Sequence, residues 1–500
     1  MNDFSSRARR GSSPSGQGRG GSASRADRPA RGRESGAERR SGPSKGQSHG
    51  HGAASGRPRA GTQPDARPNA PARPYIPAAA RIEQVRDVLG HVLQWEHPAD
   101  VTLSHWFREH ARLGSRDRHQ VAEAVFDVLR HLRRYRQIAE SGTGPASRRL
   151  AILGLVSQFA RPDLDAGLTD TERHWLDYVA RLDVSSLSRA VRHSLPDWLD
   201  AELNALPDAE SLIQSLNQPA PLDIRVNPFK ADRDAVLQAL IDQPGARQAN
   251  PQATPFSPWG IRLQGRPAIN RWSLFLSGDI EVQDEGSQLL AALVAPKRGE
   301  MIIDFCAGAG GKTLLLGALM RSTGRLYAFD VSAARLARAK PRFARSGLSN
   351  IVPVVIQSES DARVKRLRGK AHRVLVDAPC SGLGTLRRNP DLKWRQHPES
   401  LLQLRQTQAS ILREAARCVA PGGRLVYATC SVLPAENEDQ VQAFLADHPE
   451  FSLVDVADVL KDRCGNLTFQ GPYLQLRPDT HGTDGFFAAV LQRAKPETEA

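Results

Sequence analysis

Short apolar runs alternate with helical segments between residues 301 and 428, and this alternation constrains the fold more than any other feature of the chain. We predict strands at Met301–Phe305, Arg325–Phe329, Ile351–Ile356, Arg373–Val376 and Arg424–Ala428, with helices between them, such as 312–321 and 401–419. A β-α-β-α order requires a parallel sheet with helices on both faces. Ligands of such sheets bind outside the carboxyl ends of the strands, so we expect the functional site there.

The pattern divides the chain into four parts. They are a disordered tail at 1–75, an all-helical domain at 80–205, a small α+β lead-in module at 206–290 and an α/β domain at 291–495. The helical domain is predicted because apolar side chains recur at helical spacing, as in Val121, Val125 and Val128. The fold class is therefore α/β, preceded by a helical domain, a small module and a basic tail.

The net charge of +14 is concentrated in the tail. Residues 1–75 hold 15 Lys and Arg against 5 Asp and Glu, which gives +10. Few apolar residues occur there, so the segment cannot bury enough surface to fold. We interpret it as a nonspecific RNA-tethering arm, with a solubilising tail as the alternative. The helical domain also carries an arginine-rich face, interpreted as solvated with RNA contact as the alternative: Arg116, Arg118, Arg130, Arg133 and Arg134.

The cysteine spacing and the hydropathy exclude several classes of protein. The chain has five cysteines, and none lies in a zinc-ligand or disulfide-framework spacing, so we predict no metal. No apolar run approaches the roughly 18 residues of a membrane span, and no apolar signal region is recognised. We therefore expect a reduced, cytoplasmic protein with no membrane partner. No feature of the sequence indicates the oligomeric state.

A glycine-rich loop follows the first predicted strand, and residues 304–313 read D-F-C-A-G-A-G-G-K-T. A G-x-x-x-x-G-K-[ST] phosphate loop would need glycine at Cys306, and a G-x-G-x-x-G fingerprint would need it at Thr313. Asp330 ends the next strand, where an acidic residue suits the hydroxyls of a ribose. Adenosine without a pyrophosphate site favours S-adenosylmethionine; a nucleotide or a merely tight turn are the alternatives.

Two later strands are followed by cysteines. Cys380 lies in D-A-P-C-S-G after the strand at 373–376, and Cys430 lies in A-T-C-S after the strand at 424–428. One cysteine at a strand end is usually a packing residue. Two, each followed by serine and each expected at the crevice of the glycine loop, favour catalysis. We predict both Cys380 and Cys430 to be catalytic.

Methylation at carbon 5 of cytosine explains why a thiol would be needed. C5 is a poor nucleophile, because the ring is aromatic and electron-poor. A thiolate that adds at C6 turns C5 into an enamine carbon that can accept a methyl group, after which a base removes the C5 proton and the thiol is expelled. Methylation of a ring nitrogen or an exocyclic amine needs no such adduct.

At these motifs the chain resembles the RNA cytosine-5 methyltransferases of the RsmB and Sun type, over about residues 215–492. The basic loop at 383–394 and the segments at 225–227 and 283–287 are similar to other parts of that family, and 81–140 weakly resembles a NusB-like RNA-binding domain. The resemblance implies a Rossmann-like methyltransferase sheet and a cofactor site for S-adenosylmethionine. Its residues would be Cys306, Ala307, Gly308, Ala309, Gly310, Gly311, Lys312, Asp330, Asp361 and Asp377.

The resemblance also implies unequal roles for the two cysteines. In this family the Thr-Cys-Ser cysteine attacks, so Cys430 is the expected nucleophile and Cys380 assists release of the product. Asp377 is expected near the methyl donor and the amino group of the base. On the adenine side the usual Gly-Asp is missing, so we favour Asp361, with Glu359 as the alternative.

The basic loop offers further candidates that spacing alone leaves open. We interpret Arg387, Arg388 and Lys393 as phosphate contacts, with solvated side chains as the alternative. Trp394 could equally stack on a base or pack the loop.

The function expected from these features is methyl transfer from S-adenosylmethionine to C5 of cytosine in RNA, most simply ribosomal RNA, through a cysteine–C6 adduct. A tRNA methyltransferase, or a catalytically silent RNA-binding factor for ribosome assembly, are the alternatives.

Overall fold

The computed structural model describes residues 78–495 except residues 462 and 466. These described residues belong to one compact unit. The tail predicted at 1–75 lies outside the described residues, so its disorder and its role stay predictions. None of the helices in the described part of the chain is long and apolar enough to cross a bilayer.

The first part of the described chain is helical, as predicted. Its α-helices are α1 (Ala78–Val92), α2 (Ala99–Glu109), α3 (Ser115–Arg130), α4 (Leu132–Ala139), α5 (Ala146–Leu155), α6 (Arg161–Asp165), α7 (Asp170–Val179), α8 (Arg189–Arg192), α9 (Asp197–Asn204) and α10 (Ala209–Leu216). Val121, Val125 and Val128 form the apolar stripe of α3, and all three are fully buried against α1 and α5. The apolar residues that recur with a 3.6-residue period in the sequence therefore form the packed core of the helical region.

A small antiparallel sheet follows, with the strand order β2-β3-β1-β4. Its elements are β1 (Leu222–Val226), α11 (Arg233–Asp242), α12 (Pro244–Arg247), β2 (Gln252–Ala253), β3 (Gly260–Leu263), α13 (Ser273–Leu276) and β4 (Ile280–Val282). The carboxylate of Asp232 caps α11 by accepting hydrogen bonds from the amides of Asp234 and Ala235. Ile224 and Leu240 meet in the core of this α+β module.

The large sheet has the order β10-β12-β9-β8-β5-β6-β7, and β11 pairs with β12. Its strands are β5 (Met301–Asp304), β6 (Arg325–Asp330), β7 (Ile351–Val355), β8 (Ala371–Asp377), β9 (Val419–Thr429), β10 (Phe451–Val454), β11 (Leu474–Leu476) and β12 (Phe486–Arg493). The five strands β5 to β9 are parallel, as predicted. The prediction missed the antiparallel edge formed by β10, β11 and β12.

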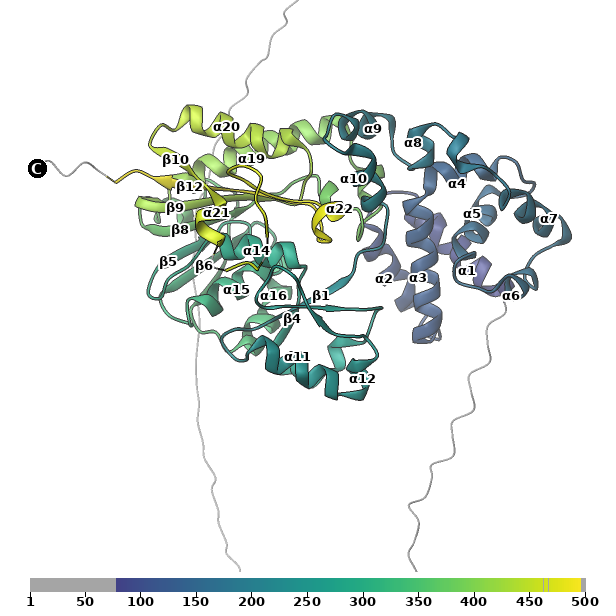
Figure 1. The fold of residues 1–500 in the computed structure, drawn as a ribbon, viewed down its shortest axis with the longest axis horizontal. Helices are drawn as coiled ribbons and strands as arrows, with labels where there is room; N and C mark the ends of the chain where they lie inside the picture. The colour runs from purple at the N-terminus through teal and green to yellow at the C-terminus, as the bar shows by residue number, and fades with distance from the viewer. Residues whose placement is uncertain (1–77, 462, 466, 496–500) are drawn as a thin grey trace, which may run out of the picture. The chain divides into compact units, whose positions relative to one another are not determined.

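Helices cover both faces of the large sheet (Figure 1). The helices of this part of the chain are α14 (Glu285–Leu293), α15 (Gly311–Leu319), α16 (Ala333–Ser346), α17 (Ala362–Lys365), α18 (Leu392–Arg395), α19 (Pro398–Ala416), α20 (Glu438–Asp447), α21 (Val456–Leu460) and α22 (Pro478–His481), of which α18 and α22 contact the helical region instead of the sheet. One apolar core joins the sheet to α19 and α20, and another joins it to α14, α15 and α21. The α/β class with a preceding helical region and small α+β module is confirmed.

One predicted helix has different bounds. The sequence pattern suggested 401–419, whereas α19 starts at Pro398 and ends at Ala416. Proline at the first helical position favours the earlier start, since its missing N–H has no partner there in any case. Val419 already pairs with Ala371 of β8, so strand pairing ends the helix early.

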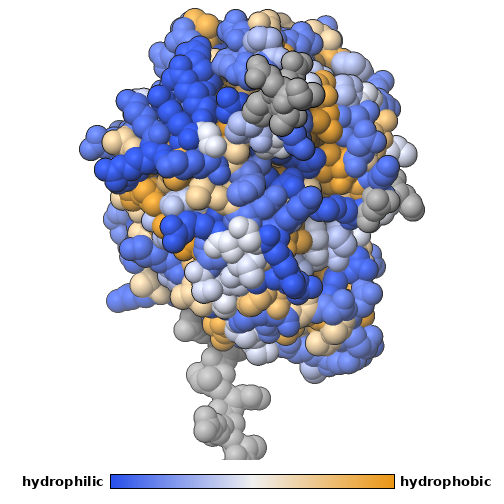
Figure 2. Space-filling view, turned by 90° about the vertical axis from the view of Figure 1, so that its left-hand side faces the viewer, coloured by the Kyte–Doolittle hydropathy of each residue, from blue (hydrophilic) through white to orange (hydrophobic). Residues whose placement is uncertain are grey.

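The parallel strands begin at the end of the sheet where β12 finishes, on the left of Figure 1. Figure 2 shows this side of the molecule, where hydrophilic side chains dominate and smaller hydrophobic areas lie between them. The polar motifs singled out in the sequence lie at the opposite ends of these strands.

Candidate active site

Strand order and register bring three aspartates to one end of the parallel strands. Asp330 and Asp377, both predicted as site residues, end β6 and β8, and Asp304, which was not predicted as a site residue, ends β5. Asp377 pairs with Ala428 of β9, two residues before Cys430. The glycine loop, the acids and both cysteines therefore follow adjacent strand ends, where parallel sheets bind ligands.

The glycine loop between β5 and α15 has two backbone positions that favour glycine. Gly308 has φ of 56°, and a Cβ placed there would meet nothing within 4 Å. Gly310 has φ of 79°, and a Cβ there would lie 2.4 Å from the ring of Phe343. The amide of Gly308 donates to Asp330 at 2.8 Å, which joins the loop to the end of β6.

Asp304 and Lys312 introduce buried charge beneath this loop. Asp304 is 1% exposed and accepts a hydrogen bond from the Thr313 hydroxyl at 2.6 Å, while its Oδ1 has no partner among the described residues. Burial raises the pKa of Asp304 to about 7. Lys312 donates to Asp377 at 2.8 Å. Burial works to lower the pKa of Lys312, but the charge and hydrogen bond of Asp377 raise it overall.

These features fit S-adenosylmethionine. The free side of Gly308 leaves room for a ligand beside the loop, and the unpaired Oδ1 of Asp304 offers a buried acceptor near a cationic cofactor. Asp330 is 3% exposed at the strand end where a ribose would be held. Val331, which the sequence analysis missed, follows it and is 61% exposed, an apolar surface that a flat adenine could cover.

The two cysteines predicted to be catalytic lie side by side. Their Sγ atoms are 3.3 Å apart, and the amide of Cys430 donates to Sγ of Cys380. The hydrogen bond with Cys430, burial and the nearby charge of Glu436 hold the pKa of the Cys380 thiol well above its usual value. The charge of Cys430 is among the causes that raise the pKa of the Lys312 ammonium, after the charge and hydrogen bond of Asp377.

The other three cysteines lie in different surroundings. Cys306 follows β5 in the glycine loop, and burial raises the pKa of its thiol well above the usual value. Cys418 is fully buried. Cys464 is 3% exposed and packs in the apolar core that includes α14.

The choice on the adenine side stays open. Asp361 caps α17 and accepts hydrogen bonds from the amide of Gln357 and from Arg363, which hold the pKa of its carboxyl well below the usual value. Glu359 accepts a hydrogen bond from Ser410 at 2.6 Å. Both carboxylates lie just beyond the end of β7, so either could still face the cofactor.

Two arginines that bind the glycine loop were missed as functional candidates. Arg225, 2% exposed in β1, donates to the carbonyl of Gly311 at 2.7 Å. Arg342 in α16 donates to the carbonyl of Ala309 at 2.6 Å. Both hydrogen bonds fix backbone carbonyls of the glycine loop. The R-V-N segment marked the first of them, but its partner lies 86 residues away.

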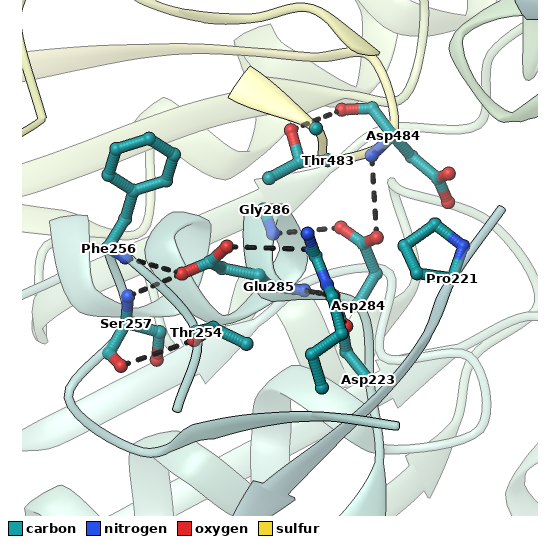
Figure 3. A network of polar contacts seen from close by, with 12 residues as sticks. Pro221, Asp223, Thr254, Phe256, Ser257, Asp284, Glu285, Gly286, Thr483 and Asp484 are labelled. Atoms are coloured by element: carbon teal, nitrogen blue, oxygen red, sulfur yellow. Dashed lines mark hydrogen bonds and ion pairs between the residues drawn. The ribbon is translucent and has the colours of Figure 1, made fainter. Parts of the chain in front are cut away.

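The phosphate interpretation of the basic loop is wrong for Arg387 and Arg388. Arg387 is 8% exposed and donates to the carbonyls of Gly482 and Thr483. Arg388 forms ion pairs with Asp284 and Asp484. Figure 3 shows the amide of Asp484 donating to Asp284, a hydrogen bond that links the start of α14 to the segment before β12. Two carboxylates already neutralise this guanidinium.

Lys393 and Trp394 connect the same loop to the helical region. Lys393 is fully buried and donates to the carbonyl of Arg130 at 2.6 Å, so it cannot reach a phosphate. Trp394 donates to the carbonyl of Leu129 at 2.8 Å and packs on the helical core. Of the two roles considered for this side chain, packing the loop is therefore the one that the structure supports, and not stacking on a base. Arg130, assigned to the solvated face, is 6% exposed and donates to the carbonyl of Arg387.

Comparison with protein families gives two matches. The family described as 16S rRNA methyltransferase RsmB/F matches residues 291–492, and the RsmF/B-like ferredoxin-like domain matches residues 195–270. A probable ribosomal RNA small subunit methyltransferase B of Synechocystis sp. is 37% identical over 317 residues, which cover 63% of this chain and 70% of the relative. The ribosomal RNA small subunit methyltransferase B of Sodalis glossinidius is 35% identical over 351 residues, covering 70% and 73%.

Solved structures resemble the same region. The crystal structure of PH0851 has a TM-score of 0.65 and 26% identity, and the match covers 84% of this chain and all of that one. A methyltransferase homolog protein from Pyrococcus horikoshii gives 0.52 and 26%, covering 62% of this chain and all of that one. NSun6 from the same organism, solved with the S-adenosylmethionine analogue SFG, shares the fold at 20% identity and a TM-score of 0.53, covering 60% and 98%.

Proposed function

This chain belongs to the RsmB/F family of 16S rRNA methyltransferases, and we propose that it methylates carbon 5 of a cytosine in ribosomal RNA. S-adenosylmethionine is the methyl donor. The observation that carries the proposal is the 3.3 Å separation of the Cys380 and Cys430 sulfurs at the strand ends beside the glycine loop. Methylation at a nitrogen or a hydroxyl would need neither thiol.

The charges around the two thiols support unequal roles. The resemblance to the RsmB/Sun-type enzymes implies that Cys430 is the nucleophile and that Cys380 assists release, and we propose the same roles here. The hydrogen bond with Cys430, burial and the negative charge of Glu436 disfavour a thiolate at Cys380, which agrees with its assisting role.

The proposed reaction begins when the Cys430 thiolate bonds to C6 of cytosine and C5 becomes nucleophilic. Bound S-adenosylmethionine supplies an electrophilic methyl group. Once C5 is methylated, a base removes the C5 proton, the C5–C6 double bond re-forms, and the electron pair of the S–C6 bond returns to Cys430. Asp377, held by Lys312, is proposed to orient the amino group of the base. Cys380, a thiol beside Cys430, is proposed to donate a hydrogen bond to the departing sulfur.

The test compares Cys430→Ala and Cys380→Ala with the wild type, using labelled S-adenosylmethionine and small-subunit rRNA. Cys430→Ala should abolish transfer without forming an adduct, and Cys380→Ala should leave enzyme covalently bound to RNA on a denaturing gel. The core variant Cys418→Ala is the control and should behave like the wild type. Adduct accumulation in Cys430→Ala would reverse the two roles. Methyl transfer by Cys430→Ala at the wild-type rate would refute covalent catalysis.

The alternative substrates and functions are separated by two measurements. Bisulfite sequencing of rRNA and tRNA from cells with and without the gene should show the loss of one methylcytosine in rRNA; loss in tRNA instead would favour the tRNA enzyme. RNA binding without transfer of label would favour a silent assembly factor. The cofactor residues, the RNA-binding role of 80–205, the domain bounds and the cytoplasmic location stay predictions.

A further inference from the structure

Both catalytic cysteines are followed by a serine, and the two serines share one buried acceptor. The hydroxyls of Ser381 and Ser431 each donate to Oε2 of Glu436 at 2.5 Å. The amide of Ser381 and the side-chain amide of Gln408 donate to its Oε1, each at 2.9 Å. Glu436 is fully buried. Burying a carboxylate costs free energy unless its oxygens accept hydrogen bonds, and here four donors supply them.

The carboxylate joins two strand ends that are separate in the sequence. Ser381 follows β8, Ser431 follows β9, and Glu436 ends the 3₁₀ helix Pro434–Glu436 after β9. The two hydroxyls also lie 3.3 Å from each other. Each serine directly follows one of the two cysteines in the chain. A shift of either cysteine's loop would therefore have to break a buried hydrogen bond between a serine and Glu436. The spacing of the two sulfurs is thereby tied to this side chain.

The donors around Glu436 are neutral, so its negative charge acts on its surroundings. The titratable groups that face Cys380 are Cys430 and Tyr427 of the β9 segment and Glu436 itself. The hydrogen bond with Cys430, burial, and the charges of Cys430 and Glu436 all raise the pKa of the Cys380 thiol. A thiol that stays protonated can donate a hydrogen bond to a departing thiolate, which is the role assigned to Cys380.

We propose that Glu436 is a positioning residue that sets the spacing of the two thiols through Ser381 and Ser431 and holds a negative charge beside Cys380. The inference rests on the proposed cysteine chemistry. The competing interpretation is a purely structural carboxylate that fills a polar gap in the core. The two interpretations differ in one respect, because only in the proposed role does the charge of Glu436 act on Cys380.

Glu436→Gln separates charge from hydrogen bonding. Glutamine keeps the volume and one acceptor oxygen, and a serine hydroxyl can accept from its amide as well as donate. Asp439→Asn is the matched control, because it removes the charge of an exposed carboxylate three residues away in α20. The first readout is alkylation of each cysteine by iodoacetamide as a function of pH, resolved by peptide mass spectrometry on the full chain without RNA.

In Glu436→Gln, the midpoint of Cys380 alkylation should move to lower pH, because a nearby negative charge has been removed. Asp439→Asn should leave the midpoint unchanged. A Glu436→Gln profile that coincides with the wild type would overturn the proposal. This measurement needs no methyl transfer, so it decides the role of Glu436 even if the cytosine chemistry proves wrong.

The second readout follows the covalent RNA adduct in single-turnover reactions. Glu436→Gln should slow release of the adduct about tenfold more than it slows formation, because the assisting thiol is perturbed rather than the attacking one. If Glu436→Gln does not fold, the serine variants Ser381→Ala, Ser431→Ala and their double variant replace it. The two serine effects on release should be non-additive if one carboxylate couples them. Additive effects would overturn the shared anchor.

Discussion

Replacement of Asp304 by Asn should make the stability of the protein less dependent on pH. Asp304 is 1% exposed, accepts a hydrogen bond from Thr313, and has one oxygen without a partner among the described residues. Burial raises its pKa from 3.8 to about 7. Asparagine has the shape of the protonated acid and can still accept from Thr313, so the variant mimics the low-pH form at every pH.

The sign and size of the effect follow from the two pKa values. A carboxyl whose pKa is higher in the folded than in the unfolded chain stabilises the fold at low pH, and this contribution is lost as the pH rises through the folded-state value. Each pH unit between the two pKa values costs about 1.4 kcal/mol. Between about pH 5 and about pH 8, Asp304 should therefore remove about 3 kcal/mol from the free energy of unfolding.

Urea unfolding followed by circular dichroism measures this difference. Asp304→Asn should already be the more stable protein at about pH 5, which lies above the unfolded-state pKa of 3.8, and its advantage over the wild type should grow by about 3 kcal/mol between about pH 5 and about pH 8. The exposed variant Asp439→Asn is the control and should follow the wild type at each pH. If the curves for Asp304→Asn and wild type stay parallel over this range, Asp304 does not carry a raised pKa and the reasoning fails.

Three further outcomes are expected. Arg225→Met should weaken S-adenosylmethionine binding about tenfold in calorimetry, because a glycine-loop carbonyl loses its buried donor; unchanged affinity would remove the arginine from the cofactor site. Mild oxidation should join Cys380 to Cys430 and block activity until a thiol reductant is added, and peptide mapping would detect the disulfide or its absence. Gly310→Ala should destabilise the fold by about 3 kcal/mol in urea, because the methyl group meets Phe343 at a positive φ; a loss below about 1 kcal/mol would contradict this.

The parallel strands themselves and the end of the sheet where the site was predicted could be read from local sequence. Alternating apolar runs predicted β5 to β9, and motifs at their ends predicted where the glycine loop and the two cysteines meet. The antiparallel edge could not be predicted in this way. It depends on the pairing of β12 with β9, such as Val490 with Val426, and a short apolar run does not specify its partner or its direction.

The basic loop shows the same limit for charged residues. Arg388 and Lys393 look exposed from sequence, since such residues are rarely buried without partners. Their partners come from distant segments: Asp284 lies 104 residues from Arg388, and the carbonyl of Arg130 lies 263 residues from Lys393. Sequence therefore identified the charge of the loop correctly but not its use as a connection between the methyltransferase and helical regions.

The sequence by itself determined the fold class, and it predicted the cofactor loop and the use of two thiols, because each depends on residue types at short spacing. Only the tertiary structure decided how those thiols are held. Glu436 lies 55 residues from Ser381, and both meet only because β8 and β9 are neighbours in the sheet. A buried carboxylate acquires its role from the donors that surround it, and those donors are set by strand order and register rather than by the residues next to it in the chain.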